Sequence, residues 1–387
     1  MSVWDELTGQ AEAIAVFEAA AAASSVGGSN DSSMTHSWLI TGPPGSGRSN
    51  LAFAFATALL SPTSAGDPAV QRQVEARTHP DLAVLSTDRV IISIEEVRQL
   101  VATSQFSPSV GRFRVVIIED ADRMTERTSN VLLKALEEPP PRTVWILCAP
   151  SEADLIPTIR SRVRTVQLRV PAVADVAELI HRRDGVDLET ATRAAREAQS
   201  HIGMAHRLAT NADARERRAR TIEVALGIRS VSGAVLAAGS LLQLATDDAK
   251  AITEERDAEE RESALRSLGI EPGGTIPAAL RVQLKNLEED QKRRATRSLR
   301  DGIDRILVDL LSLYRDVLLI QLGVGTDLIN LSIEKDLMRA SEAATAQQTL
   351  ATMDAIATAR KRIAGNVAPA LALEAMLVAA VRTVPAR

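Results

Sequence analysis

The sequence is poor in cysteine and in aromatic residues. Of its 387 residues one is cysteine, Cys148, and only 2% are aromatic. A single cysteine excludes an intrachain disulfide and a zinc site built from several cysteines of this chain. Because aromatic residues are scarce, aliphatic side chains and alanine-rich helix packing must build most of the interior. Cys148 lies in the apolar run 144–148, so we expect it to be a small buried hydrophobic residue.

Long apolar runs and an excess of positive charge are also missing. No stretch of about 18–20 residues, the length of a membrane-spanning helix, is free of charge, and no basic segment followed by an apolar core opens the chain. The formal net charge is -5, which gives no global footprint for nucleic acid or a membrane surface. We therefore expect a cytoplasmic protein without a membrane partner, whose DNA contacts would use a local basic face or partner chains.

The first 170 residues alternate strand-like and helix-like segments, a pattern typical of a doubly wound α/β domain with a parallel sheet. Residues 24–33 and 61–78 are predicted to be irregular, the second because Pro62, Gly66 and Pro68 interrupt it. Strands are predicted at 38–41, 82–85, 114–118, 143–148 and 163–170, and helices at 12–23, 50–60, 94–104 and 128–138.

After Pro171 the pattern is helical throughout. Three short helices, 173–182, 188–200 and 202–211, predict a small helical domain over 171–211, and residues 212–387 are predicted to form a second helical domain. That domain ends in apolar helices at 303–322 and 366–381. Residues 247–301 are dense in charge and are interrupted near 269–277. Two interpretations of this segment stay open: a solvated insertion, and a docking surface for another chain.

A phosphate-binding loop follows the first predicted strand and precedes a helix. It matches GxxxxGK[ST] at every fixed position except one, where Arg48 replaces lysine. Backbone N–H groups of such a loop bind phosphate oxygens, and the helix dipole favours the anion. Arginine keeps the positive charge, but its longer, planar guanidinium does not fit the lysine position in the same way. The loop indicates nucleotide binding and argues against hydrolysis. Its candidate residues are Gly42, Pro43, Pro44, Gly45, Ser46, Gly47, Arg48 and Ser49.

An acidic pair, Glu119 and Asp120, ends the predicted strand 114–118. In phosphate-loop ATPases an acidic pair at this strand end holds the magnesium shell and polarises the attacking water, in the order Asp then Glu. Here the order is exchanged. Catalysis is one interpretation of the pair, and an ordinary polar strand end is the other.

Ser161 and Arg162 lie just before the last predicted strand. An exposed arginine there either forms part of a basic surface turn or reaches into a neighbouring subunit. In the second case it neutralises charge on a transferring phosphoryl group, an effect of roughly 10³–10⁵ in turnover.

Several of these segments together resemble clamp-loader AAA+ subunits of bacterial DNA polymerase III. The stretch 130–140, NVLLKALEEPP, is similar to the family's NALLKTLEEPP with two changes in eleven positions. Residues 96–98, 114–122 and 158–164 carry the resemblance further, and 4–10 and 366–374 are similar to the family's opening segment and last helix. The resemblance is strong over 1–210 and weak beyond.

The resemblance implies an AAA+ P-loop core over 1–170, a helical lid over 171–211 and an oligomerising helical collar over 212–387. It also implies the delta-prime branch of the family, whose members have a degenerate ATP site. Ala149 and Pro150 stand where the first sensor has threonines, and Gly203 stands near the second sensor arginine. Ser161-Arg162 matches the family's Ser-Arg-Cys motif, with Val163 in place of the cysteine. The implied role is a stator without ATPase activity that lends Arg162 in trans to a neighbouring ATPase subunit.

The implied partners are the tau/gamma and delta subunits, the sliding clamp and primed DNA, within a hetero-oligomeric polymerase holoenzyme. Arg98 and Lys134 match segments that follow the DNA backbone in relatives, where contacts are independent of sequence. Each is equally interpretable as a surface salt-bridge residue. Many relatives hold zinc with four cysteines in the region of 61–78, which has none here, so we expect no zinc.

Two alternatives to the stator without nucleotide remain. An active AAA+ clamp-loader-type ATPase would tolerate Arg48 in its loop. A passive subunit would bind ATP or ADP without hydrolysing it, using the loop N–H groups and Ser49. No cofactor is required in the stator interpretation.

Overall fold

The computed structural model describes residues 3–4, 7–24, 33–87, 91–267, 281–325 and 327–382. The chain forms two compact units, Met1–Thr210 and Asn211–Arg387. Most of the predicted loop 24–33, the segment 269–277 and Asp5 and Glu6 of the opening segment lie outside the described residues.

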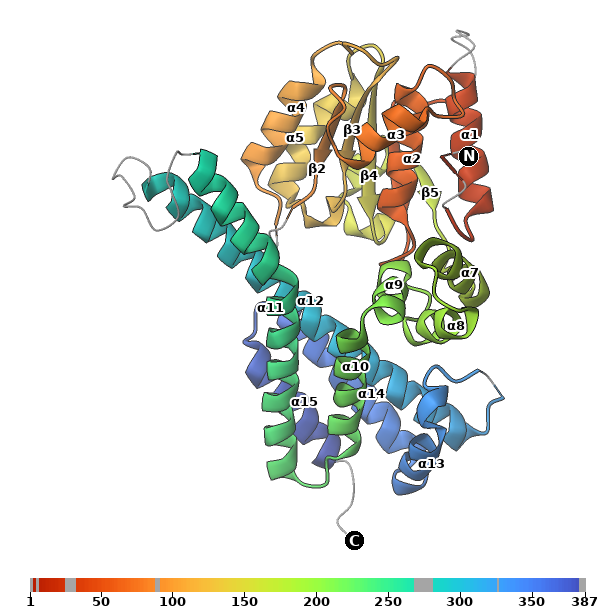
Figure 1. The fold of residues 1–387 in the computed structure, drawn as a ribbon, viewed down its shortest axis with the longest axis vertical. Helices are drawn as coiled ribbons and strands as arrows, with labels where there is room; N and C mark the ends of the chain where they lie inside the picture. Colours follow the sequence, from red (N-terminus) through yellow and green to blue (C-terminus); the bar gives the residue numbers. More distant parts are fainter. Residues whose placement is uncertain are drawn as a thin grey trace. The chain divides into compact units, whose positions relative to one another are not determined.

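A parallel five-stranded sheet organises the first unit (Figure 1). Its order is β2-β3-β4-β1-β5, with every neighbouring pair parallel. The strands β1, β3 and β4 are buried along their whole length, as expected for parallel strands covered on both faces. The strands are β1 (Ser37–Thr41), β2 (Leu82–Leu85), β3 (Arg114–Ile118), β4 (Thr143–Ala149) and β5 (Arg164–Gln167).

Helices cover both faces of this sheet because successive strand side chains point to opposite sides. Trp38 and Ile40 of β1 belong to the core beneath α1 (Ala11–Ala23) and α2 (Arg48–Leu60). Leu39, between them, belongs to the core beneath α4 (Ile94–Ser104) and α5 (Glu126–Glu137). Phe17, Trp38 and Phe55 stack with ring centroids 4.5–5.5 Å apart. Cys148 is fully buried in the first core, as predicted, and burial raises the pKa of its thiol to about 12.

The prediction that residues 61–78 are irregular is wrong. Helix α3 (Pro68–Glu75) forms there. Pro68 occupies the first helical turn, where its missing N–H costs nothing, and the Asp67 side chain accepts hydrogen bonds from the N–H groups of Ala69 and Val70. The proline that appeared to interrupt the segment therefore starts a helix.

Other elements lie close to their predicted bounds. Helix α4 is confirmed at both ends, and Ser93 and Glu96 form a capping box. The last strand is shorter than predicted, since β5 covers 164–167 and not 163–170. Three helices close the first unit as predicted: α7 (Val173–Asp184), α8 (Leu188–Glu197) and α9 (Ile202–Thr210). Gly185 ends α7 with a φ of 68°.

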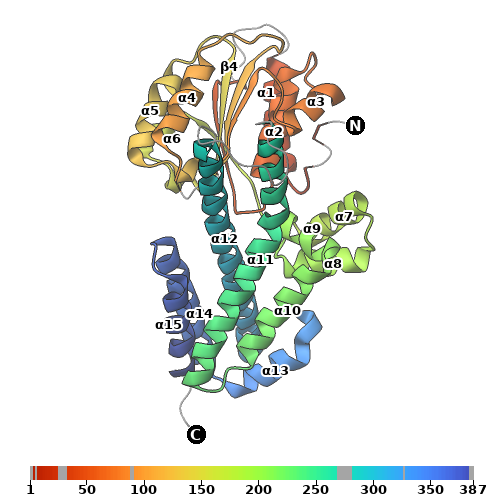
Figure 2. The same ribbon diagram turned by 60° about the vertical axis from the view of Figure 1, so that its left-hand side comes forward.

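The second unit is entirely helical in the described residues. Leu241, Leu307, Leu310 and Leu373 are among its most buried side chains. Within the charged segment, residues 247–267 belong to α11 and residues 281–301 belong to α12, and these two helices lie side by side (Figure 2). The elements of the second unit are α10 (Ala212–Leu226), α11 (Val231–Ser267), α12 (Arg281–Leu322), the 3₁₀ turn η4 (Leu331–Ile333), α13 (Glu334–Ala343), α14 (Ala346–Ala364) and α15 (Pro369–Arg382).

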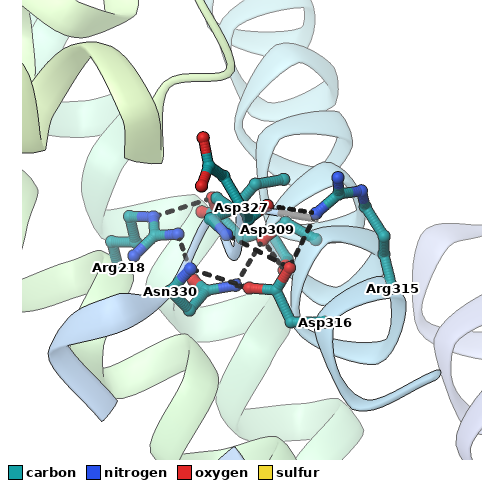
Figure 3. Close-up of polar contacts among 8 residues, drawn as sticks. Arg218, Asp309, Arg315, Asp316, Asp327 and Asn330 are labelled. Carbon is teal, nitrogen blue, oxygen red and sulfur yellow. Dashed lines mark hydrogen bonds and ion pairs between the residues drawn. The ribbon is translucent and has the colours of Figure 1, made fainter. Parts of the chain in front are cut away.

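A buried polar network fixes the segment between α12 and α13 (Figure 3). Asp316 is fully buried and accepts hydrogen bonds from the N–H groups of Ile329 and Asn330 at 3.1 and 2.7 Å. The Asn330 side chain donates to Asp316 at 2.9 Å and accepts from Arg218 of α10 at 2.6 Å. Arg315 pairs with Asp316 at 2.8 Å. These buried polar groups are paired with one another, so burying them leaves no unpaired donor or acceptor among these contacts. The network therefore holds the segment after α12 in place against that helix.

The fold class expected from the sequence is confirmed. A P-loop α/β domain with a parallel sheet is followed by a small helical lid and an all-helical region. The boundary drawn between core and lid at 170 and 171 stays a prediction.

Candidate functional site

The phosphate-binding loop connects β1 to α2. Gly45 and Gly47 have φ of 79° and 91°, a backbone region that glycine adopts without strain. Gly47 is the N-cap of α2 and supplies no side-chain cap. The first N–H groups of α2, those of Arg48 and Ser49, have no partner within the helix, because the first turn of any helix leaves them unpaired. The loop therefore keeps the backbone geometry of an anion site at its helix end.

Part of the loop is bonded to the rest of its own chain. The Gly42 N–H donates to the carbonyl of Pro150 at 3.2 Å, and the Ser46 N–H donates to Pro43 at 3.2 Å. Pro150, in the predicted first sensor position, thus offers the loop a backbone acceptor. The Ser46 hydroxyl is buried without a hydrogen-bond partner in the described part of the chain.

The start of α9 covers the loop. The Ile202 N–H donates to the Gly45 carbonyl at 3.2 Å. A methyl group placed on Gly45 would lie 2.2 Å from Cγ of His201. The sequence placed the second sensor near Gly203 in this segment, but His201 and Ile202 are the residues that reach the loop. The contacts of these two residues with the loop could not be predicted from the sequence, because neither residue belongs to a motif.

Arg48, in the lysine position, acts on the acidic end of β3. Its Nη1 is buried and has no hydrogen-bond partner among the described residues. Burial raises the pKa of Asp122 and so does Asp120, while the nearby charges of Arg123 and Arg48 lower it. The charge of Arg48 also acts on Cys148 at the end of β4. The guanidinium is therefore close enough to the strand ends to interact with them.

The predicted acidic pair is engaged by arginines of its own chain. Glu119, only 13% exposed, accepts a hydrogen bond from Arg77 Nη2 at 2.6 Å. Asp120 forms an ion pair with Arg123 at 3.8 Å. The 3₁₀ turn η1 (Ala121–Arg123) brings Arg123 back over Asp120. Sequence reasoning missed Arg77 and Arg123, because neither lies in a recognisable motif.

These pairs bear on whether the acidic residues fit a magnesium ion. A Mg²⁺ site needs carboxylate oxygens that are free to coordinate in near-octahedral geometry. Glu119 and Asp120 each form an ion pair with an arginine of the same chain. Paired in this way, the two carboxylates differ from the open, oxygen-lined metal site of an active P-loop ATPase.

Arg162 follows the short helix α6 (Pro157–Arg160) and precedes β5. Its Nε donates to Glu137 at 2.6 Å, and its Nη1 donates to the Thr158 carbonyl at 2.7 Å and to the Ser161 hydroxyl at 3.1 Å. The Arg162 side chain is 32% exposed, so it is only partly accessible, whereas the sequence predicted an exposed arginine. Ser161 is exposed and its hydroxyl donates to Thr158 at 3.1 Å. The structure thus joins Arg162 to the stretch 130–140 through Glu137.

The part of the chain that holds this site is similar to known subunits of DNA polymerase III. Residues 23–172 match the sequence model of the family described as DNA polymerase III, delta subunit. A delta' subunit from Pseudomonas aeruginosa is 34% identical over 154 residues, covering 38% of this chain and 47% of the relative. One from Escherichia coli K12 is 31% identical over 143 residues, covering 35% and 43%. Residues 23–172 are similar to delta-prime subunits of DNA polymerase III.

The match to the delta-prime family covers the core and not the whole chain. The chain spans less than half the length of the curated delta-prime relatives that it matches. A tau subunit from Escherichia coli K12 is 28% identical over 156 residues, covering 39% of this chain and 24% of the relative. Among solved structures, a gamma subunit-related protein from Thermotoga maritima covers 90% of this chain and 95% of its own, with a TM-score of 0.43 and 18% identity.

The two candidate DNA contacts lie on neighbouring helices of the delta-prime core (Figure 1). Arg98 on α4 pairs with Glu95 at 2.8 Å and is 55% exposed. Lys134 in the last turn of α5 is exposed. The alternative interpretation of Arg98, as a surface salt-bridge residue, matches this pair, and DNA contact stays a prediction for both.

Within the ranges that the structure describes, no three His, Cys, Asp or Glu residues gather as a metal-binding group. None of the helices in these ranges is both long and apolar enough to cross a bilayer.

Proposed function

We propose that the chain is a clamp-loader subunit that does not hydrolyse ATP and that supplies Arg162 to the ATP site of a neighbouring subunit. Its partners in this role are the tau/gamma and delta subunits, the sliding clamp and primed DNA. The family match of residues 23–172 supports membership in such an assembly.

The ion pairs of Glu119 and Asp120 support the proposed lack of ATP hydrolysis. An active site of this type needs one carboxylate for the magnesium shell and one for the attacking water. Glu119 faces Arg77, and Asp120 faces Arg123. Freeing either carboxylate would break an ion pair of the subunit itself, and the lysine that normally contacts the outer phosphates is replaced by Arg48.

The retained Ser161-Arg162 motif supports the second half. Arg162 is partly exposed, and its fork is already ordered by partners of its own chain. An arginine added to a neighbour's triphosphate stabilises charge on the transferring phosphoryl group, an effect of roughly 10³–10⁵ in turnover.

Arg162→Ala in the reconstituted clamp loader tests the proposal. We expect the complex to assemble normally and its DNA-stimulated ATPase to fall, because one ATP site loses most of its turnover. Arg160→Ala is the matched control, since Arg160 is an exposed arginine two residues away in the same turn. Equal ATPase for wild type and Arg162→Ala would contradict the role in trans.

An active ATPase is the rival function. Phosphate release by the purified chain, with and without primed DNA, decides between them. We expect no turnover above background, and turnover that disappears in Glu119→Gln would establish the rival.

Passive nucleotide binding is compatible with the proposal. The N–H groups that begin α2 favour a phosphate group, as in other P-loops. Calorimetry of the isolated chain with ADP measures such binding directly. It distinguishes a stator that holds ATP or ADP without hydrolysis from one whose loop stays unoccupied.

A further inference from the structure

The guanidinium of Arg162 is held by its own chain on nearly every side. Arginine has five N–H donors. Nε donates to Glu137 at 2.6 Å and Nη2 forms an ion pair with the same carboxylate. Nη1 donates to the Thr158 carbonyl and the Ser161 hydroxyl. These contacts account for four of the five donors and leave one N–H of Nη2 for another acceptor.

Glu137 and Arg162 each lie close in sequence to a residue that is buried in the core. Glu137 is the last residue of α5, directly after Leu136, which is fully buried. The Leu136 carbonyl is bonded by His36 at 3.0 Å and by Ser37 at 3.4 Å, which ties this helix end to the start of β1. On the other side, Ile159 of α6 is fully buried. The pair therefore joins two anchored elements, α5 and α6.

The energy of such a pair is small. Glu137 is 44% exposed and Arg162 is 32% exposed, and exposed ion pairs contribute about 0–1 kcal/mol to folding. An effect on stability of this size does not explain a contact in which Nε and Nη2 share one oxygen, Oε1, of Glu137. Its effect on geometry is larger, because a long side chain that is fixed before binding loses less entropy on binding and acts from one position.

We propose that Glu137 is a positioning residue that orients Arg162 for the triphosphate of the neighbouring subunit. This inference rests on the proposed role of Arg162 in trans. Glu137 does not touch the nucleotide. Its carboxylate accepts from Nε and pairs with Nη2, which leaves one N–H of Nη2 for an oxygen of the triphosphate.

A double-mutant cycle in the reconstituted clamp loader tests this, with kcat and KM measured separately. We expect Glu137→Ala to lower kcat of the affected ATP site by up to about 10²-fold, the cost of misplacing a catalytic group, with KM little changed. Glu137→Gln keeps an oxygen acceptor for Nε and should recover part of kcat. Glu138→Ala is the matched control, because Glu138 is the next residue and is exposed.

The combined variant separates the possible results. If Glu137 acts through Arg162, Arg162→Ala with Glu137→Ala is no slower than Arg162→Ala alone. Effects that multiply would overturn the inference, because Glu137 would then act elsewhere. A slow Arg162→Ala with a normal Glu137→Ala would overturn the inference and leave the proposed function standing. An unaffected Arg162→Ala would overturn both. Thermal unfolding of each variant checks that folding is unchanged.

Discussion

Single arginine residues determine the chemistry of the P-loop site. Arg48 brings a guanidinium to the lysine position, Arg77 reaches Glu119, and Arg123 reaches Asp120. Arg77 does so from a backbone φ of 57°, in the left-handed region that few non-glycine residues adopt. Arg77 and Arg123 thus pair with the two acidic residues that follow β3, the strand end that an active P-loop ATPase uses for a cation and a water molecule.

Asp81 is a buried carboxylate whose charge contributes to the stability of the first unit. It is fully buried before β2 and accepts hydrogen bonds from the N–H groups of Ser109, Val110 and Gly111 at 2.6–2.7 Å. Burial alone would raise the pKa of its carboxyl. The hydrogen bonds from Gly111, Ser109 and Val110 outweigh burial and lower that pKa to about 2. Arg114 adds a contact at 3.3 Å.

The depressed pKa gives a pH dependence. Because the folded pKa lies below the ordinary value of 3.8, the stabilisation is present above pH 3.8 and is lost as the pH falls towards 2. It amounts to about 2 kcal/mol at neutral pH. We expect Asp81→Asn to destabilise the protein at pH 7 and the difference from wild type to shrink between pH 4 and 2, measured by urea unfolding. A difference that stays constant over that range would show that the charge of Asp81 is unimportant.

At the scale of elements, the helix α3 depends on one capping residue. Asp67 accepts from Ala69 and Val70, and its own N–H donates to the buried hydroxyl of Ser61 at 2.9 Å. Loss of an N-cap costs about 1 kcal/mol. We expect Asp67→Ala to lower the free energy of unfolding by that amount and to speed amide hydrogen exchange in residues 69–75. Asp67→Asn, which keeps an acceptor, is the control. Unchanged exchange in Asp67→Ala would mean that packing alone holds α3.

Elements were predictable where local signals agree with tertiary packing. Helix α4 and strand β3 were predicted at 94–104 and 114–118, and the structure confirms both ranges. The prediction for residues 61–78 was wrong because it treated Pro68 as a helix breaker. Proline favours the first turn of a helix when an acidic cap precedes it. The signal was present in Asp67-Pro68 and was weighed wrongly.

Candidate site residues were predictable only within motifs. Arg48 and Arg162 stand in recognisable patterns, so both were found in the sequence. Arg77 and Glu137 act on motif residues 42 and 25 positions away, and the fold alone brings them together. No local pattern records a contact of that separation, which is why the partners of the site residues appear only in the structure.

At the scale of the whole molecule, the two units differ in what they contain. The first unit has the family match, the P-loop and Arg162. The second is helical and is fixed internally by features such as the Asp316 network. Its predicted role as an oligomerising collar, and the open role of residues 247–301, are questions about the assembly and not about the isolated chain.

The most direct measurement of the central claim is a cryo-electron microscopy structure of the assembled clamp loader with a slowly hydrolysed ATP analogue and magnesium. We expect Arg162 at hydrogen-bonding distance, about 3 Å, from a phosphate oxygen of the neighbouring subunit's triphosphate. We also expect Glu119 and Asp120 of this chain to coordinate no magnesium. A guanidinium of Arg162 that faces solvent, far from every triphosphate, would contradict the claim.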